Sequence, residues 1–140
     1  MRSETLSIHT GSTPAVRDIT EQCARFAGAG GAGADGRDGV LHVFVPHATA
    51  GVAILETGAG SDDDLLSVLD GLLPADRRWR HRHGSPGHGR DHVLPALVAP
   101  YATVPVLGGE LGLGSWQRIC LVDLNVDNPD RTVRLSFLTG

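Results

Sequence analysis

The stretch from Trp79 to His92 holds four of the chain's seven histidines, together with three arginines and three glycines. Imidazole is the commonest metal ligand in proteins, and the forked guanidinium group suits carboxylate and phosphate. Glycine lets the backbone approach a ligand closely. This composition is typical of a metal or anion site, but a solvated basic loop would have it as well.

The pair His81 and His83 would place two imidazoles on one side of a strand, as in several zinc hydrolases. In those enzymes an aspartate usually follows in the next positions, whereas this sequence continues with Gly84-Ser85. The specific match to a zinc hydrolase therefore fails.

A fifth histidine, His47, stands between two apolar runs, residues 40–45 and 52–56. A single histidine at such a break is more often a hydrogen-bonded structural residue than a ligand. Its small neighbours, from Ala48 to Gly51, leave room beside the ring for another group, and this favours a functional role.

Two carboxylates, Glu56 and Asp123, stand at the polar edges of apolar strands. From there each could orient a histidine ring by accepting its second ring proton. For Asp123 the favoured alternative is simple exposure at the surface, because aspartate is seldom buried.

Hydrophobic periodicity predicts the elements that must position these groups. Leu6 and Ile8 alternate with polar residues as in a half-buried strand, and Ser61 is the expected cap of a helix that Pro74 ends. A glycine-rich connector is expected at residues 28–39. The pattern indicates an α+β fold, a largely antiparallel mixed sheet with two or three helices. Strands are expected at residues 4–10, 40–45, 52–56, 101–106, 111–113, 117–126 and 131–139, the last two joined as a hairpin by 127–130, and helices at 16–26, 61–73 and 93–98.

The bulk properties exclude several classes of protein. A chain of 140 residues, 41% apolar, is expected to form one domain over residues 1–140. The net charge of -4 argues against a nucleic-acid binder. No apolar run has the length of a membrane span or the pattern of a signal peptide, so a cytoplasmic location is expected. The absence of lysine excludes Schiff-base, pyridoxal-phosphate and Walker-type phosphate-loop chemistry. Cys23 and Cys120 are expected to be buried free thiols.

From His47 onward the sequence resembles the YjbQ family, also called the secondary thiamine-phosphate synthase family. The matching segments follow one another in order and span about two-thirds of the chain. They are His47-Ala48-Thr49-Ala50, Glu56, Trp79-Arg80-His81, His92, Val104-Pro105-Val106 and Leu113-Gly114-Ser115-Trp116-Gln117.

The resemblance implies a small α+β protein whose sheet is folded on itself and which assembles as a trimer. It also implies weak thiamine-phosphate synthase activity, a reaction that joins a pyrimidine-methyl diphosphate to a thiazole phosphate and releases pyrophosphate. The departure of pyrophosphate needs cationic stabilisation, commonly from a divalent metal together with arginine.

This sequence departs from the family pattern in its histidine-rich stretch. Gly87-His88 stands where relatives usually have an aspartate-containing pair, Asp91 replaces an alanine, and Thr57 replaces an asparagine. Either His83 or His88 could take over a ligand role from the missing carboxylates.

The histidine pattern and the family resemblance together predict one site. His47, His81 and His92 are expected to bind a divalent metal, most simply zinc, with Glu56 as a supporting carboxylate. Direct binding of phosphate by these histidines is the competing reading. The expected function is a metal-assisted enzyme acting on a phosphorylated small molecule, and the alternative is a non-catalytic trimer that binds a metal or an anion. The residues expected to bind substrate are Arg80, Trp116, Gln117 and Arg118.

Overall fold

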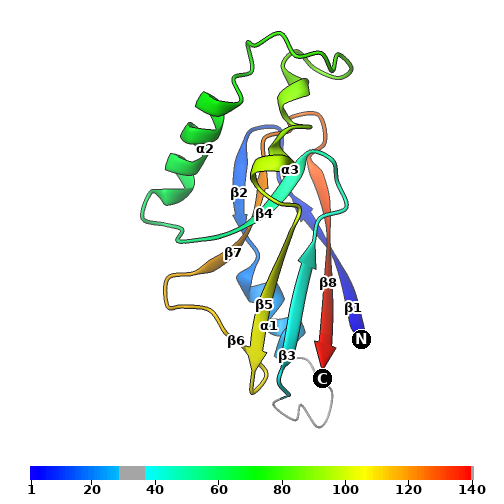
Figure 1. Cartoon of the computed structure of the whole chain (residues 1–140), viewed down its shortest axis with the longest axis vertical. Helices are drawn as coiled ribbons and strands as arrows, with labels where there is room; N and C mark the ends of the chain where they lie inside the picture. Colours follow the sequence, from blue (N-terminus) through cyan, green and yellow to red (C-terminus); the bar gives the residue numbers. More distant parts are fainter. Residues whose placement is uncertain (29–36, 140) are drawn as a thin grey trace.

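The computed structural model describes residues 1–28 and 37–139, which form two antiparallel sheets and three α-helices (Figure 1). The larger sheet has the strand order β1-β8-β3-β5-β6 and the smaller has the order β2-β7-β4. The α+β prediction is confirmed. The strands are β1 (Arg2–His9), β2 (Ala15–Asp18), β3 (Gly39–Phe44), β4 (Ala50–Leu55), β5 (Tyr101–Leu107), β6 (Glu110–Leu111), β7 (Arg118–Asp123) and β8 (Asp130–Thr139); the helices are α1 (Thr20–Gly28), α2 (Ser61–Leu72) and α3 (Leu94–Leu97), with a 3₁₀ turn η1 (His88–Arg90).

One apolar core joins the two sheets. Alternate residues of β3, β5 and β8 point inward, and they meet side chains of β4 and β7 together with Cys23 and Phe26 of α1. This arrangement explains the period-two pattern of the long strands, since one face of each is buried. The core includes Leu41, Val43, Val52, Val104, Val106, Ile119, Leu121, Val133 and Leu135.

Strand β7 is covered on both of its faces. Ile119 and Leu121 face the main core, whereas Val122 packs with Leu69 of α2 and Leu94 of α3 in a second apolar cluster. Every residue from Ile119 to Asp123 is buried. A strand buried on both faces reads as a continuous apolar run, and this one holds its only carboxylate at its end.

The structure corrects two local predictions. The predicted helix 16–26 is in fact a strand followed by a helix. Val16 pairs with Val122 in the smaller sheet, and α1 begins only at Thr20. The N–H of Thr20 donates to Asp18 Oδ1 at 2.8 Å. Gly60 rather than Ser61 caps α2, with a φ of 101° and no side-chain hydrogen bond. Of the glycine-rich connector, residues 29–36 lie outside the described part of the chain.

The last two long strands do not form the predicted hairpin. β7 pairs with β2 and β4, whereas β8 pairs with β1 and β3, so the link 124–129 carries the chain from one sheet to the other. The links after β1 and β3 make the same crossing. His9 pairs with Asp130 and Ala50 with Asp123, so the three links gather at one end of the molecule, at the top of Figure 1.

No helix within residues 1–28 and 37–139 is long and apolar enough to cross a membrane.

Candidate metal centre

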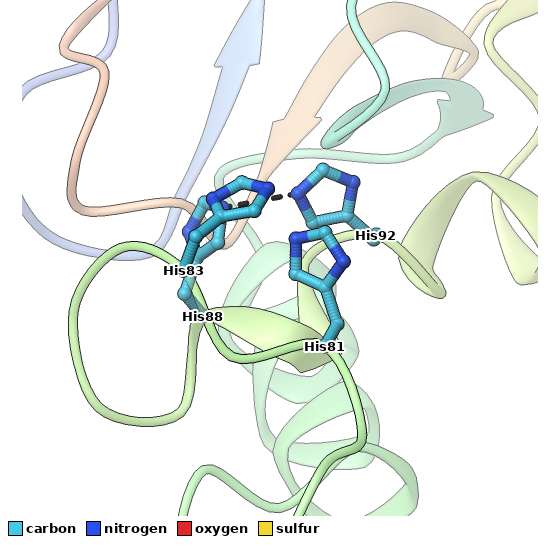
Figure 2. Close-up of side chains that lie close together, drawn as sticks. All are labelled: His81, His83, His88 and His92. Carbon is cyan, nitrogen blue, oxygen red and sulfur yellow. Dashed lines mark hydrogen bonds between the residues drawn. The ribbon is translucent and has the colours of Figure 1, made fainter.

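Four imidazole rings converge at the end of the molecule where the sheet links gather. They belong to His81, His83, His88 and His92, and one ring nitrogen from each lies within 4.8 Å of those of the others (Figure 2). The Nε2 atoms of His88 and His92 lie 3.0 Å apart. Nitrogen atoms this close together can serve as a common ligand set after small rotations of the rings.

The inner pair of rings is anchored by the fold. His88, in η1, is only 9% exposed, and its Nδ1 lies 3.0 Å from Asp127 Oδ2 and 3.2 Å from Asp91 Oδ2. Neither contact has the angular geometry of a hydrogen bond. His92 follows one turn later and is half-buried. The two carboxylates therefore face the side of the His88 ring that points away from the other imidazoles.

The outer pair of rings is exposed. His81 and His83 lie on the loop that leads to η1, with their ring centroids 4.0 Å apart. Together with His88 they line a pocket of about 290 Å³, to which Arg77 and Arg82 also contribute. A small molecule bound in this pocket would contact both imidazole and guanidinium groups.

The electrostatic surroundings favour the neutral form of His81 and His92. Burial, followed by the neighbouring imidazoles, lowers the pKa of His81 and of His92. Hydrogen bonds from Ser85 lower the pKa of Asp127, whereas burial raises the pKa of Asp91 to about 6. A metal requires deprotonated ring nitrogens, so this clustering of histidines favours metal binding at neutral pH.

Hydrogen bonds hold the histidine loop against the C-terminal end of α2 and the residues that follow it. Arg90 Nη1 donates to Asp70 Oδ1 at 2.6 Å and to the carbonyl of Leu73 at 3.1 Å. Trp79 donates its indole N–H to the carbonyl of Pro74 at 3.1 Å. A Cβ at Gly89 would lie 2.4 Å from Trp79 Cβ, so only glycine permits this approach.

The structure does not bring His47 into the four-ring group. Its Nε2 accepts a hydrogen bond from the backbone N–H of Thr132 at 2.9 Å, which occupies the lone pair that a metal would need. Burial, then Arg131, lowers the pKa of His47, against an opposing effect of Asp123. In the described chain His47 is therefore hydrogen-bonded to the backbone and lies outside the four-ring group.

Asp123 is buried, contrary to the favoured prediction of surface exposure. It is 1% exposed and forms a two-pronged ion pair with Arg131, at 2.6 Å from Nε and 2.9 Å from Nη2. Thr10 donates a further hydrogen bond at 2.8 Å. The buried arginine offsets the cost of burying the carboxylate, a pairing that strand periodicity alone does not indicate.

The other predicted site residues do not line the pocket, and those at Glu56 and 116–118 lie at the far end of the smaller sheet. Arg80 is exposed and does not line the pocket. Trp116 and Gln117 precede β7, at the opposite end of that strand from Asp123, and Arg118 pairs there with Leu55 of β4. Glu56 directly follows Leu55 and is exposed at the same far end.

The donor set fits a divalent metal of borderline softness. Imidazole ligands suit zinc, and a carboxylate behind a ligating histidine is the usual supporting partner. His83 and His88 belong to the group, although the sequence prediction assigned the metal to His47, His81 and His92 and named His83 or His88 only as a possible replacement. The signal for both was present in the density of histidines between 79 and 92.

The fold and the donor set define an α+β protein of two facing antiparallel sheets with a candidate histidine metal centre. The chain belongs to the UPF0047 protein YjbQ-like family, which it matches over residues 4–140.

Relatives and solved structures agree with this membership. A UPF0047 protein of Mycobacterium tuberculosis is 69% identical over 103 residues, which cover 74% of this chain and 77% of that protein. The crystal structure of a hypothetical protein from Aeropyrum pernix K1 is similar at a TM-score of 0.86 and 30% identity, over 100% of both chains. An uncharacterized conserved protein of the YjbQ/UPF0047 family from Clostridium acetobutylicum has a TM-score of 0.83 at 27% identity, over 96% of this chain and 99% of that one.

Proposed function

We propose that this protein binds a zinc ion through the four-histidine group and uses it in an enzymatic reaction on a phosphorylated small molecule. The observation that supports the proposal is the convergence of the imidazoles of His81, His83, His88 and His92, whose ligand atoms lie within 4.8 Å of one another. Three or four neutral imidazoles are a familiar ligand set for zinc.

The two pairs of rings have different tasks in this proposal. His88 and His92 hold the ion from the protein side, because the fold fixes them. His81 and His83 face the pocket, where one of them can yield its place to a substrate oxygen. A bound zinc ion supplies a Lewis acid that polarises a phosphate oxygen.

Arg77 and Arg82 are the proposed phosphate-binding residues because both line the pocket beside the histidines. The Arg77 guanidinium group lies 5.1 Å from the ring centroid of Trp79, a cation–π contact that restricts its position. Guanidinium groups bind phosphate through paired hydrogen bonds. The candidate reaction is the one that the resemblance implies. A thiazole nitrogen forms a bond to the pyrimidine methylene carbon, the bond from that carbon to the diphosphate oxygen breaks, and pyrophosphate leaves with both electrons.

A turnover assay tests the enzymatic proposal. Purified protein is stripped of metal, reloaded with zinc, and incubated with pyrimidine-methyl diphosphate and thiazole phosphate while pyrophosphate release and thiamine phosphate are measured. The proposal expects turnover that depends on zinc and is lost in His88→Ala. Zinc-independent turnover, or turnover unchanged in that variant, would contradict the role of the metal.

A non-catalytic metal-binding protein is the second candidate. The observation that favours it is the number of rings, since four imidazoles can fill the tetrahedral shell of zinc and leave no position for a substrate. Tight zinc binding without turnover, with all four histidines bound to the ion by X-ray absorption spectroscopy, would favour this candidate.

For assembly and location we propose a homotrimer in the cytoplasm. Trp116 is 72% exposed in the single chain, so the alternative that it packs in the chain's own core does not hold. A large exposed side chain among small residues suits a subunit contact, and Gln117, Arg118 and Glu56 lie at the same end of the molecule. Cys23 and Cys120 are buried and free, as is usual in a reducing compartment.

A further inference from the structure

Residues 123–127, which carry the chain from β7 toward β8, form a hydrogen-bonded relay that ends at the histidine group. The relay starts at the buried ion pair of Asp123 with Arg131. Asp123 Oδ1 accepts the N–H of Asn125 at 2.9 Å, and Asn125 Oδ1 accepts the N–H of Asp127 at 2.7 Å. Asn125 also donates to Thr49 Oγ1 at 3.0 Å. Each step fixes the next residue, so a buried ion pair sets the position of Asp127.

Asp127 in turn contacts two residues of the histidine loop. Its carboxylate accepts hydrogen bonds from the hydroxyl of Ser85 and, at 3.0 Å, from the N–H of Ser85. The Oδ2 atom that accepts the Ser85 N–H also lies 3.0 Å from His88 Nδ1. One carboxylate from a distant part of the sequence therefore holds the loop by hydrogen bonds and lies beside the His88 ring as a close charged neighbour, without the angular geometry of a hydrogen bond.

The orientation of His88 gives this contact its significance. With Nδ1 toward Asp127, the opposite ring nitrogen, Nε2, faces His92 Nε2 at 3.0 Å. A neutral imidazole carries one proton, and a carboxylate beside Nδ1 favours the tautomer with the proton there. That tautomer leaves the lone pair on Nε2, which is the form a metal needs.

We infer that Asp127 is a positioning residue for the metal centre: it holds His88 in the Nδ1-protonated form with Nε2 turned toward the other three imidazoles. This inference rests on the proposed zinc site. Asp127 does not contact the ion itself and acts through the His88 ring. Asp91, the second carboxylate near Nδ1, lies at 3.2 Å and comes from the same loop as the ring. Asp127 therefore supplies the link from the histidine group to the sheets.

The test compares zinc affinity in Asp127→Asn with that in Asp130→Asn. Asp130 is a matched control because its carboxylate is exposed, lies three residues further along the chain and pairs with His9 at 2.9 Å. Asp127→Asn is expected to weaken zinc binding about 10- to 100-fold, the usual effect of removing a carboxylate behind a ligating histidine. Asp130→Asn is expected to bind like wild type. Equal affinities in the two variants would overturn the inference.

A double-mutant cycle separates positioning from general stability. In a His88→Ala background, Asp127→Asn is expected to cause no further loss of zinc affinity, because the ring through which it acts is gone. An equally large loss in that background would show a structural role and overturn the inference. Ser85→Ala, which removes one hydrogen bond to Asp127 but keeps its charge, is expected to cause a smaller loss, and thermal unfolding checks that each variant is folded.

A measurement without metal distinguishes failure of the inference from failure of the zinc proposal. Nitrogen-15 NMR of the metal-free protein at pH 7.5 is expected to find the proton of the His88 ring on Nδ1, and to find less of this tautomer in Asp127→Asn. A proton on Nε2 in wild type would overturn the inference even if zinc binds. If the wild-type chain binds no zinc, the proposed function is wrong. The measured tautomer of His88 would still show whether Asp127 sets the position of the ring proton.

Discussion

The Nε2 atoms of His88 and His92 lie 3.0 Å apart, and the rings of His81 and His83 close the space beside them (Figure 2). Two neutral imidazoles in this position can share a single proton, and a metal ion can replace that proton and bind both. The arrangement depends on η1 and the hydrogen-bonded turn that follows it, which together place the two residues about one helical turn apart. It also depends on Gly84 and Gly87, whose positive φ angles turn the loop back over the rings.

Gly84→Ala is expected to damage the metal centre directly. A Cβ at this position would lie 2.7 Å from Asp127 Oδ2 and 2.9 Å from the His88 ring, and the φ of 80° is itself strained for alanine. We expect zinc affinity to fall by about tenfold or more, as when the support of a ligating histidine is disturbed. The measurement is a zinc titration followed by calorimetry.

Gly58→Ala is the matched control, because Gly58 has the same φ of 80° but nothing within 4 Å of its Cβ position. Both variants are expected to lose about 1 kcal/mol of unfolding free energy from backbone strain, and only Gly84→Ala should lose zinc affinity. If both bound zinc like wild type, the crowding at Gly84 would have no functional meaning.

His47 makes the metal-free protein less stable in acid. Its pKa is lowered in the folded state, so between the folded pKa and the unfolded value of about 6.5 the unfolded chain binds more protons. By linkage the unfolding free energy falls as pH falls through this window. Urea unfolding at several pH values should show a shallower decline in His47→Gln than in wild type.

The same variant separates the two roles considered for His47. Because the ring accepts the Thr132 N–H and stands outside the four-ring group, His47→Gln should keep its zinc affinity within about threefold of wild type. A collapse of zinc binding in this variant would restore His47 as a ligand.

Much of the fold could be predicted from sequence because the strands have one buried face. Alternation located β1, β3, β5 and β8 to within two residues. It could not show that β7 and β8 belong to different sheets, since a link of polar residues looks the same in a hairpin and in a crossing. Only the pairing of β7 with β2 and β4 decides this, and those contacts are distant in sequence.

The site could be predicted only in part for the same reason. The density of histidines marked the loop, and His81 and His92 do lie together. The carboxylate that supports His88, however, comes from Asp127, 39 positions further along the sequence. The predicted substrate-binding residues Trp116, Gln117 and Arg118 lie at the far end of β7. Within one chain they are therefore separated from the four histidines.

The pocket arginines are expected to bind pyrophosphate. Arg77→Ala and Arg82→Ala should each weaken binding of pyrophosphate to the zinc-loaded protein about tenfold, which corresponds to the loss of a charged hydrogen bond. Arg78→Ala is the control, because Arg78 is exposed beside Arg77 and does not line the pocket. Isothermal calorimetry measures all three, and an equal effect of Arg78→Ala would mean that only general positive charge matters.

Assembly is tested by light scattering at micromolar concentration. A trimer predicts a mass three times the 14.7 kDa of the chain, and Trp116→Ser should shift the population toward monomer. Val68→Ser is the control, since Val68 is also well exposed, at 58%, but lies on α2. A wild-type protein with the mass of one chain would contradict the proposed trimer.

Zinc titration of the metal-free protein at pH 7.5 shows whether the four histidines form a metal site. We expect one zinc ion per chain, with affinity reduced in each of His81→Ala, His83→Ala, His88→Ala and His92→Ala, most strongly for the two anchored rings, His88 and His92. His42→Ala is the control, because His42 lies on β3 and its Nδ1 contacts Thr103 Oγ1 at 3.0 Å, away from the group. Absence of zinc binding in wild type, or undiminished affinity in all four variants, would show that the four-histidine group is not a zinc site.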